Sequence, residues 1–351
     1  MEKPIKLSCR NVWKVYGDSP DRFFDQGAGT VPDPDAHAGG IRESGHIVAC
    51  GDVSFDVHVG EIFVIMGLSG SGKSTVVRCL SRLVEPTAGE VLLDGEDLLK
   101  KNAAELIDIR RHKMGMVFQS FGLLPHLNVI DNIAFPLKLQ GLGVAERRQR
   151  AQRVIDLVGL TGREKSYPRQ LSGGQQQRVG IARSLAVEPD IWFLDEPFSA
   201  LDPLIRREMQ NEFLSIQNQL HKSIVFITHD FLEALRIADR MMIMKDGQIV
   251  QMGTPAELIV SPADDYVADF TNDVPVTRVL TARSVVRATD ESDRGEGLPE
   301  VDEKCCIEDL LPVLAEAPGV RVRAEDGTSL GIATAENVIR ALARESTADG
   351  R

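Results

Sequence analysis

The sequence predicts an α/β fold built on a mainly parallel sheet, followed by a smaller α/β module. Apolar strand patterns alternate with helical patterns, a glycine-rich loop joins one strand to a helix, and polar residues follow three later strands. Alternation of strands and helices is typical of parallel sheets, which bind ligands at the carboxyl ends of their strands. We therefore expect the functional residues at one edge of the sheet.

The composition indicates a globular protein that does not bind nucleic acid. The 351 residues suffice for two domains, and 43% of them are hydrophobic, which is enough for a full core. A net charge of −12 disfavours polyanionic partners. The N-terminus lacks an apolar signal segment, and no apolar run approaches the roughly 20 residues of a membrane helix. We expect a soluble or peripheral protein that cannot itself form a pore.

A glycine-rich loop at residues 67–74 predicts a nucleotide site. The strand pattern Ile62–Met66 leads into G-x-x-x-x-G-K-[ST], and an apolar helical pattern starts at Ser74. Glycines let backbone N–H groups turn inward around an anion, and the helix start adds its positive dipole end. Lys73 would reach the β- and γ-phosphates, and the Ser74 hydroxyl would bind Mg²⁺. The alternative is a plain glycine turn, which the match of motif and context disfavours.

Polar residues follow three further apolar strand patterns. Gln119 ends one, Asp195 and Glu196 end another, and His229 follows a third. Asp195 can hold Mg²⁺ through water, and Glu196 can act as the base or orienting group for the attacking water. Gln119 could complete the metal or water shell, and His229 could donate to the γ-phosphate. The alternatives are a carboxylate pair that caps the next helix and a structural histidine.

The stretch Leu171–Gln175 discriminates among phosphate-loop proteins. It reads Leu-Ser-Gly-Gly-Gln, and with the polar residues above it makes the chain resemble the ATP-binding cassette (ABC) family over about residues 5–270. The resemblance implies an ABC-type P-loop NTPase domain at residues 1–270, with a helical subdomain at about 120–185. It also implies ATP hydrolysis with ATP and Mg²⁺ as cofactors.

The resemblance assigns three roles to the motif residues. The expected nucleotide-binding residues are Tyr16, Gly67, Ser69, Gly70, Gly72, Lys73, Ser74, Thr75, Ser172, Gly173, Gly174, Gln175 and Asp202. The expected Mg²⁺ ligands are Ser74, Gln119 and Asp195. The expected catalytic residues are Lys73, Gln119, Glu196 and His229.

The signature also implies a second copy of the chain. Ser172 and the amides of Gly173 and Gly174 would form an anion-binding surface at a helix start. In the family this surface contacts the γ-phosphate held by the opposite subunit, and residues 199–202 cross the interface. Since the chain has one cassette, we expect a homodimer that holds each ATP between its two subunits.

Residues 17–45 are predicted to form an inserted surface loop, because they are rich in Gly, Pro and Asp and show weak periodicity. The insertion separates Tyr16 from the phosphate loop. Tyr16 is the expected adenine platform, since a flat ring can stack on the base. The alternatives are Trp13 as the platform and a core-packing role.

Four segments are similar to the ATPases of glycine betaine and proline betaine importers. Those ATPases share an insertion at the position of residues 17–45. The segments are 63–70, 80–87, 116–121 and 198–206. The similarity implies a peripheral subunit on the cytoplasmic face of the membrane. It would act with an integral permease and, indirectly, with a substrate-binding protein. Glycine betaine, proline betaine, choline and carnitine stay open as solutes, because this subunit does not touch the solute.

Two other functions compete with this one. A soluble ABC ATPase that acts on another macromolecular machine usually carries two cassettes, a long coiled coil or a zinc insertion, and the sequence shows none of these. A non-catalytic nucleotide-binding scaffold is disfavoured by the intact Lys73, Glu196 and His229. Co-purification with an integral membrane protein would discriminate the importer subunit from the other two.

The segment after Gln119 is too apolar for an ordinary solvated loop. It contains Phe121, Leu123 and Leu124, and large exposed apolar groups commonly mark a protein contact. We expect it to form part of a socket for a cytoplasmic permease helix, with Gln119 reporting the γ-phosphate state. Alternatively, these side chains cap the core of the helical subdomain.

Residues 276–345 are predicted to form a single CBS-like α/β module. Two helical patterns, Ile307–Ala317 and Ala335–Ala343, flank two short strands. Seven acids at 290–303 indicate a solvated acidic connector. The betaine importer ATPases carry two such units, so the single module is either an ionic-strength sensor or a packing and dimerisation unit.

Overall fold

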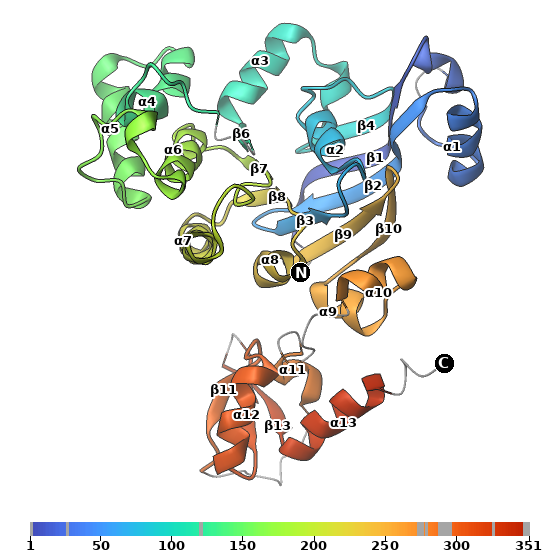
Figure 1. The fold of residues 1–351 in the computed structure, drawn as a ribbon, viewed down its shortest axis with the longest axis vertical. Helices are drawn as coiled ribbons and strands as arrows, with labels where there is room; N and C mark the ends of the chain where they lie inside the picture. Colours follow the sequence, from blue (N-terminus) through green and yellow to red (C-terminus); the bar gives the residue numbers. More distant parts are fainter. Residues whose placement is uncertain are drawn as a thin grey trace. The chain divides into compact units, whose positions relative to one another are not determined.

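The computed structural model describes residues 3–25, 28–118, 122–271, 277, 280–286, 297–324 and 327–346. The chain divides into two compact units, Met1–Met252 and Gly253–Arg351, which are coloured blue to yellow-orange and orange to red in Figure 1. The motifs of the nucleotide site all lie in the first unit.

The first unit combines two sheets with helices. Its strands are β1 (Ile5–Tyr16), β2 (Ile47–His58), β3 (Ile62–Met66), β4 (Ala88–Leu93), β5 (Glu96–Asp97), β6 (Met114–Val117), β7 (Ile191–Asp195), β8 (Ser223–Ile227), β9 (Arg240–Lys245) and β10 (Gln248–Gly253). Its α-helices are α1 (Pro34–Glu43), α2 (Lys73–Leu80), α3 (Ala103–His112), α4 (Val129–Leu139), α5 (Val144–Leu157), α6 (Gly173–Leu185), α7 (Pro203–Leu220) and α8 (Phe231–Ile237). Short 3₁₀ helices are η1 (Pro20–Phe23), η3 (Leu98–Lys100) and η4 (Pro168–Gln170).

The two sheets enclose the main core. One has the strand order β2-β1-β4-β5 and antiparallel pairing, and the other has the order β10-β9-β3-β8-β7-β6. Every residue of β3, β7 and β8 is buried, which explains their continuous apolar runs. The rings of Phe55 and Phe63 stack across the core at 4.8 Å, and the buried side of α2 packs into the same cluster.

A helical subdomain of α4, α5 and α6 lies beside this core (Figure 1). Asn128 caps α4 by accepting from the Asp131 N–H at 2.9 Å. Ser172 caps α6 through a capping box with Gln175. Both helices therefore begin where a polar side chain satisfies their free N–H groups.

The prediction of a loop for residues 17–45 is wrong in part, because this segment contains η1 and the ten-residue helix α1. Asp33 caps α1 by accepting from the Ala36 N–H at 3.0 Å, and Pro34 occupies the first helical position. The helix is short and rich in small residues, so its periodicity is weak in the sequence. Its buried Ala38 and Ile41 still join Trp13 and Phe24 in a small core of their own.

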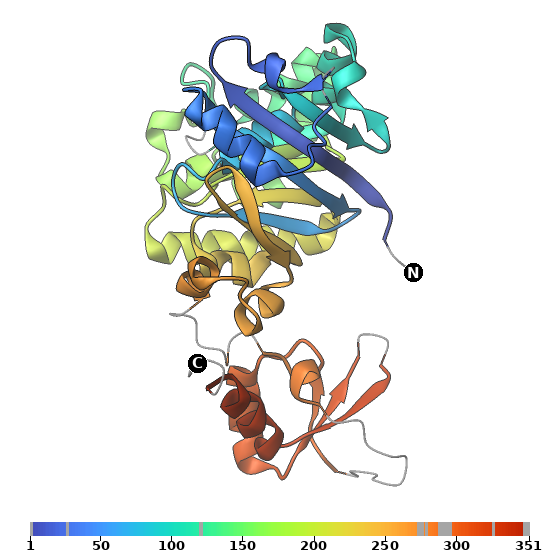
Figure 2. The ribbon, with the colours of Figure 1, turned by 90° about the vertical axis from the view of Figure 1, so that its right-hand side faces the viewer.

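The second unit contains a three-stranded sheet with helices. Its elements are α9 (Pro255–Val260), α10 (Asp265–Thr271), α11 (Ala282–Val285), β11 (Glu300–Asp302), α12 (Ile307–Glu316), β12 (Val320–Arg323), β13 (Ser329–Ala333) and α13 (Ala335–Ser346). β12 is the central strand, parallel to β11 and antiparallel to β13. In Figure 2 the red helices α12 and α13 lie together on one side of this sheet.

The acidic segment 290–303 is not a solvated connector along its whole length. Glu300–Asp302 forms strand β11, and Glu303 is buried and pairs with Arg283. Arg323 binds the Glu300 carboxylate at 2.7 Å and lowers its pKa. Arginines from neighbouring elements therefore neutralise part of the charge that the sequence alone leaves unpaired. Residues 290–296 lie outside the described residues.

Candidate functional site: a nucleotide site at the edge of the parallel sheet

Parallel pairing brings the predicted motifs to one edge of the six-stranded sheet. β3 pairs with β8 so that Ile65 lies beside Ile227, and β7 pairs with β8 so that Asp195 lies beside the same residue. Gly67 comes two residues after Ile65, and His229 comes two residues after Ile227. The phosphate loop, the acidic strand end and the histidine therefore converge, as expected for the carboxyl edge of such a sheet.

The phosphate loop runs from Gly67 to the start of α2. Gly67, Gly70 and Gly72 have φ values of 146°, 85° and 98°. A Cβ on Gly72 would lie 2.2 Å from the Ala49 carbonyl oxygen, so only glycine fits there. Ser69 and Gly70 are exposed, and the buried Ser71 hydroxyl has no hydrogen-bond partner among the described residues. An open cradle with an unpartnered hydroxyl fits a phosphate group.

Lys73 is the first residue of α2, and only 5% of its surface is exposed. Its Nζ donates to the carbonyl oxygens of Gly67 at 2.7 Å and Leu68 at 2.9 Å. Burial lowers the pKa of Lys73, while the nearby Glu196 and Asp195 oppose that shift. The ammonium group thus lies inside the loop, where phosphate oxygens can replace the two carbonyls.

Ser74 and Asp195 supply a pair of oxygen ligands next to Lys73. The Ser74 Oγ donates to Asp195 Oδ1 at 2.9 Å. Burial raises the pKa of Asp195, and the Ser74 hydrogen bond opposes this shift. Within the described part of the chain, no three His, Cys, Asp or Glu side chains form a metal-binding group. The Ser74 hydroxyl and the Asp195 carboxylate are oxygen ligands of the kind that Mg²⁺ takes in nucleotide sites, together with phosphates and waters.

Glu196 and His229 face each other beside this pair, with 3.3 Å between Glu196 Oε2 and His229 Nδ1. The Glu196 backbone has φ 45°, a left-handed conformation that costs a non-glycine residue about 1–2 kcal/mol. It is held by the hydrogen bond from its N–H to the Ile227 carbonyl at 3.1 Å. Asp202 caps the next helix, α7, so helix capping does not explain the Asp195-Glu196 pair. Backbone strain at such a position is typical of functional sites.

The signature and Asp202 form a second, separate surface. Ser172 and Gly173 are exposed, and Ser172 bonds with Gln175 of its own helix. A Cβ on Gly174 would lie 2.8 Å from the Ile205 Cγ2. This close contact joins the start of α6 to the start of α7, which Asp202 caps. The exposed starts of α6 and α7 therefore lie next to each other.

The remaining predicted residues have different positions. Tyr16 ends β1 with 44% of its surface exposed, and the Lys14 ammonium lies 5.0 Å from its ring. Trp13 is fully buried and donates to the Gly29 carbonyl at 2.8 Å, so it is not the adenine platform. Thr75 is half-buried on α2. Gln119 lies outside the described residues.

Sequence reasoning gave no role to Arg206, at the end of the 198–206 segment. Its Nη2 donates to the Leu201 carbonyl at 3.1 Å, and its Nη1 lies 3.5 Å from Asp230 Oδ2. Arg206 therefore joins the segment before α7 to the residue that follows His229. The sequence shows the arginine, but it does not predict this link, because Leu201 and Asp230 are distant from each other along the chain.

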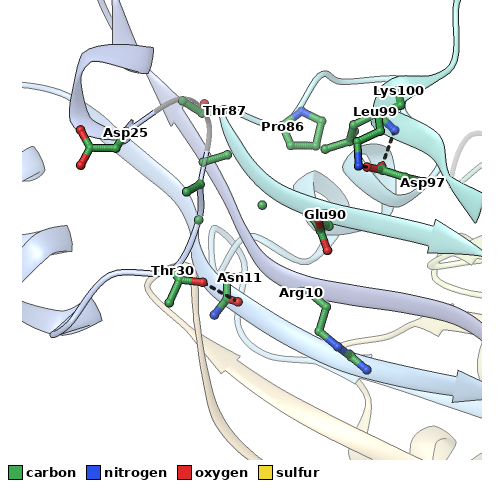
Figure 3. Close-up of a pocket in the computed structure, with 14 residues that line it drawn as sticks. Arg10, Asn11, Asp25, Thr30, Pro86, Thr87, Glu90, Asp97, Leu99 and Lys100 are labelled. Atoms are coloured by element: carbon green, nitrogen blue, oxygen red, sulfur yellow. Dashed lines mark hydrogen bonds and ion pairs between the residues drawn. The ribbon is translucent and has the colours of Figure 1, made fainter. Parts of the chain in front are cut away.

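A hollow of about 660 Å³ lies elsewhere, between the insertion and β4 (Figure 3). Two pairs of its polar side chains bond to each other: Thr30 Oγ1 donates to Asn11 Oδ1 at 3.2 Å, and Lys100 Nζ lies 3.0 Å from Asp97 Oδ2. None of the predicted nucleotide-binding residues lines it. The nucleotide site is therefore the region where the strand ends converge, and this hollow is a separate feature.

Comparison with known proteins decides the family. Residues 50–199 match the sequence profile described as ABC transporter. The trimethylamine N-oxide transport system ATP-binding protein TmoW of Ruegeria pomeroyi is 51% identical over 349 residues, which cover 99% of this chain and 97% of that protein. The chain belongs to the ATP-binding proteins of ABC transporters. ATP hydrolysis is the activity of this family.

Two further members of the ABC family match smaller parts of the chain. The glycine betaine/proline betaine transport system ATP-binding protein ProV of Escherichia coli is 49% identical over 288 residues, which cover 81% of this chain and 70% of ProV. The dimeric structure of the ABC transporter cassette MJ0796 matches with a TM-score of 0.58 and 33% identity, covering 71% of this chain and 98% of that cassette. A second MJ0796 structure, bound to ADP and Pi, matches with the same TM-score. Within the described residues of this ABC protein, no helix combines the length and hydrophobicity needed to span a bilayer.

Proposed function

We propose that this chain is the ATP-hydrolysing subunit of an importer for small methylated amine solutes, bound peripherally to the cytoplasmic face of the membrane. The observation that carries the proposal is the convergence of Lys73, Ser74, Asp195, Glu196 and His229 at one sheet edge. The likeness to transporter ATP-binding proteins along the whole chain supports it.

The phosphate loop would hold the β- and γ-phosphates of ATP. The amides of Ser69, Gly70 and Gly72 and the start of α2 would face the anion, and Lys73 would exchange its two carbonyl partners for phosphate oxygens. Ser74, Asp195 and Gln119 would hold Mg²⁺, which neutralises charge that develops on the phosphates. Thr75 would support the same loop from α2.

Glu196 would remove the proton from the water that attacks the γ-phosphorus, while the bond from that phosphorus to the bridging oxygen of ADP breaks. His229, 3.3 Å from the carboxylate, would donate to a γ-phosphate oxygen. His229 would also help to orient the Glu196 carboxylate. The bond from the Glu196 N–H to the Ile227 carbonyl holds the backbone that carries this carboxylate.

A second copy of the chain would complete each ATP site. The exposed Ser172 and Gly173, together with Gly174, Gln175 and Asp202, would contact the nucleotide held by the partner subunit. The free N–H groups at the start of α6 suit a phosphate. The dimeric MJ0796 structure supports this arrangement, since the match with this chain covers 98% of the MJ0796 cassette.

The permease would dock in a groove between α3, β6 and the helical subdomain. This groove has a volume of about 390 Å³, and its lining includes Phe118, Leu124, Phe135, Leu139 and Arg183. Phe118 and Leu139 expose 39% and 46% of their surfaces. Apolar walls with exposed rims suit a short amphipathic helix of a membrane partner. Leu123 is half-buried, and Phe121 lies outside the described residues.

Trimethylamine N-oxide is the solute we propose within this class. The two TmoW proteins, from Ruegeria pomeroyi and Pelagibacter ubique, match over 97–99% of this chain, tail included. ProV matches only 81% of it. Proteoliposomes that contain this chain, its permease and the binding protein should take up labelled trimethylamine N-oxide when ATP is enclosed. Uptake of glycine betaine alone would contradict this solute, and absence of ATP-dependent uptake of both would contradict the importer function.

The C-terminal module would act as a single CBS-like unit that contacts the same module of the second copy. Its element order from β11 to α13 is strand, helix, strand, strand, helix. Leu311 on α12 and Ile339 on α13 expose 41% and 64% of their surfaces. Exposed apolar groups on two helices support a packing role between copies.

A further inference from the structure

Two helices follow the segments that carry Glu196 and His229. Helix α7 begins after Asp202, seven residues beyond the end of β7, and α8 begins two residues after His229. The two helices lie beside each other (Figure 1). Contacts between α7 and α8 can therefore fix how the two segments are placed relative to each other.

Glu233, on α8, joins these elements through its carboxylate. Only 5% of its surface is exposed, and its Oε1 accepts from Gln210 Nε2 of α7 at 2.9 Å. The hydroxyl of the buried Thr228, next to His229, also donates to this carboxylate. Burial raises the pKa of Glu233, and the bonds from Thr228 and Gln210 oppose that shift. A buried carboxylate is costly without polar partners, and Glu233 takes its partners from α7 and from the strand end that carries His229.

Arg206 of α7 brings a hydrogen-bond donor to the same place. Its Nη2 and Nη1 contact Leu201 and Asp230, but its buried Nε has no hydrogen-bond partner among the described residues. Buried N–H groups are nearly always hydrogen-bonded, and an ordered water serves where no protein group is in reach. The Arg206 Nε therefore points to a bound water.

A small cavity lies among these groups. Its lining includes Glu196, Arg206, Thr228, His229 and Glu233. Its volume of about 10 Å³ is close to the roughly 10–15 Å³ that a single water molecule requires. A buried water also needs several polar partners, and this lining offers an N–H donor, a hydroxyl and carboxylate acceptors. The cavity therefore suits one water in both size and chemistry.

We propose that this cavity holds one water molecule, which accepts from Arg206 Nε and donates to the Glu233 carboxylate, and that Glu233 is a positioning residue for hydrolysis. The inference rests on the proposed function, in which Glu196 and His229 act on the γ-phosphate. The water and Glu233 would join α7 to the strand end that carries His229, so that Glu196 and His229 keep their separation of 3.3 Å.

The proposal predicts an effect on turnover and not on nucleotide binding. Glu233 would act through the alignment of Glu196 and His229, which matters most when the bond to the γ-phosphorus breaks. Glu233→Leu removes the carboxylate and should lower kcat about fivefold to tenfold, the effect of losing about one hydrogen bond in the transition state. The KM for ATP should change little.

The first test measures ATP hydrolysis and the unfolding temperature of the purified full-length chain. Glu233→Gln keeps an oxygen acceptor for Gln210 and an amide that can bond to the Thr228 hydroxyl, so it should restore most of the kcat that Glu233→Leu loses. Glu61→Leu is the matched control, because Glu61 is 4% exposed and hydrogen-bonded but lies just before β3, at the opposite edge of the same sheet. It should lower the unfolding temperature and leave kcat unchanged.

The second test asks whether Arg206 and Glu233 share one water. If they do, Arg206→Gln combined with Glu233→Leu should lower kcat about as much as the larger of the two single changes, and not by their product. A high-resolution crystal structure of the wild-type chain should show the water within hydrogen-bond distance of Arg206 Nε. If Glu233→Leu does not fold, Thr228→Val removes the hydroxyl at similar shape and takes its place in both measurements.

Several outcomes would overturn the proposal. A normal kcat in Glu233→Leu, with only the loss of stability that Glu61→Leu shows, would make Glu233 a structural residue. Independent effects of Arg206→Gln and Glu233→Leu, or a crystal structure without the water, would exclude the shared water. Failure of the proposed function has a different result, because Glu196→Gln would then hydrolyse ATP normally. If Glu196→Gln is inactive and Glu233→Leu is normal, only the present inference fails.

Discussion

The phosphate-loop surface and the signature surface of this ABC protein differ in how their polar groups are satisfied. On the first, Lys73 is buried and donates to two carbonyls, and Ser74 bonds to Asp195. On the second, Ser172 and Gly173 are exposed, and Ser172 bonds to Gln175 within its own helix. One surface holds Lys73 and Ser74 in hydrogen bonds within the chain, and the other is an open helix start.

We propose that this difference reflects two unlike halves of a site, which each chain contributes to a dimer. The phosphate-loop half can bind its ligand within one chain, whereas an open helix start with free N–H groups needs an anion from outside. The close contact between Gly174 and Ile205 keeps α6 and α7 in register, so the open half keeps its shape without a ligand. A second copy would supply what each half lacks.

Glu196→Gln should have the largest effect, because it removes the proposed base while keeping the shape of the side chain. We expect ATP hydrolysis to fall at least about 100-fold, with ATP binding retained and an ATP-bound dimer accumulating. Phosphate release and size-exclusion chromatography with ATP measure both effects. Glu146→Gln, on the exposed side of α5, is the control. Hydrolysis near the wild-type rate would show that Glu196 is not the base.

Leu139→Glu should weaken docking of the permease, because it places a charge in the proposed groove at the end of α4. We expect association with the permease to fall on the order of tenfold or more, with basal hydrolysis by the isolated subunit unchanged. Val144→Glu is the matched control, since Val144 is 56% exposed and does not line the groove. Pull-down and uptake assays test the pair. Equal losses of hydrolysis and folding stability would instead assign Leu139 to the core of the helical subdomain.

Arg206→Gln should lower kcat about tenfold, because Arg206 joins Leu201, before α7, to Asp230, after His229. Losing hydrogen bonds from a charged donor would cost about 1.5–3 kcal/mol if they are fully formed in the transition state. The KM for ATP should change little. Arg207→Gln, at an exposed neighbouring position, controls for charge. A change in the KM for ATP without a change in kcat would contradict the proposed role of Arg206 in linking Leu201 to Asp230.

Deletion of residues 276–351 should have the smallest effect. If the modules of two copies contact each other through charged and apolar surfaces, the response of transport to salt should flatten while ATP hydrolysis persists. The screening length falls from about 10 Å at 0.1 M salt to about 3 Å at 1 M, so a charged contact would respond over this range. Uptake across a salt series measures the response. An unchanged salt response would leave the module with a packing role only.

The phosphate-loop half was predictable from the sequence because its chemistry lies in short, continuous motifs. Strand patterns before Gly67, Asp195 and His229 placed these residues at one sheet edge, and the register confirms that convergence. The insertion was predicted less well, since α1 is too short to show a clear period and its anchor, Trp13, lies outside the segment. Likewise, the pairing of Glu303 with Arg283 depends on tertiary structure. The solute could not be read from a subunit that does not touch it.

Heterodimer complementation tests the central claim, that each ATP site takes its two halves from different chains. Differently tagged Lys73→Ala and Ser172→Arg subunits would be co-purified as heterodimers and assayed for ATP hydrolysis. The control heterodimer joins a wild-type subunit to one that carries both substitutions. Sites shared between chains leave one intact site in the first heterodimer and none in the control. We therefore predict hydrolysis up to about half the wild-type rate in the first and very little in the control. The reverse result, an inactive first heterodimer and an active control, would contradict the account and place both halves of each site within one chain.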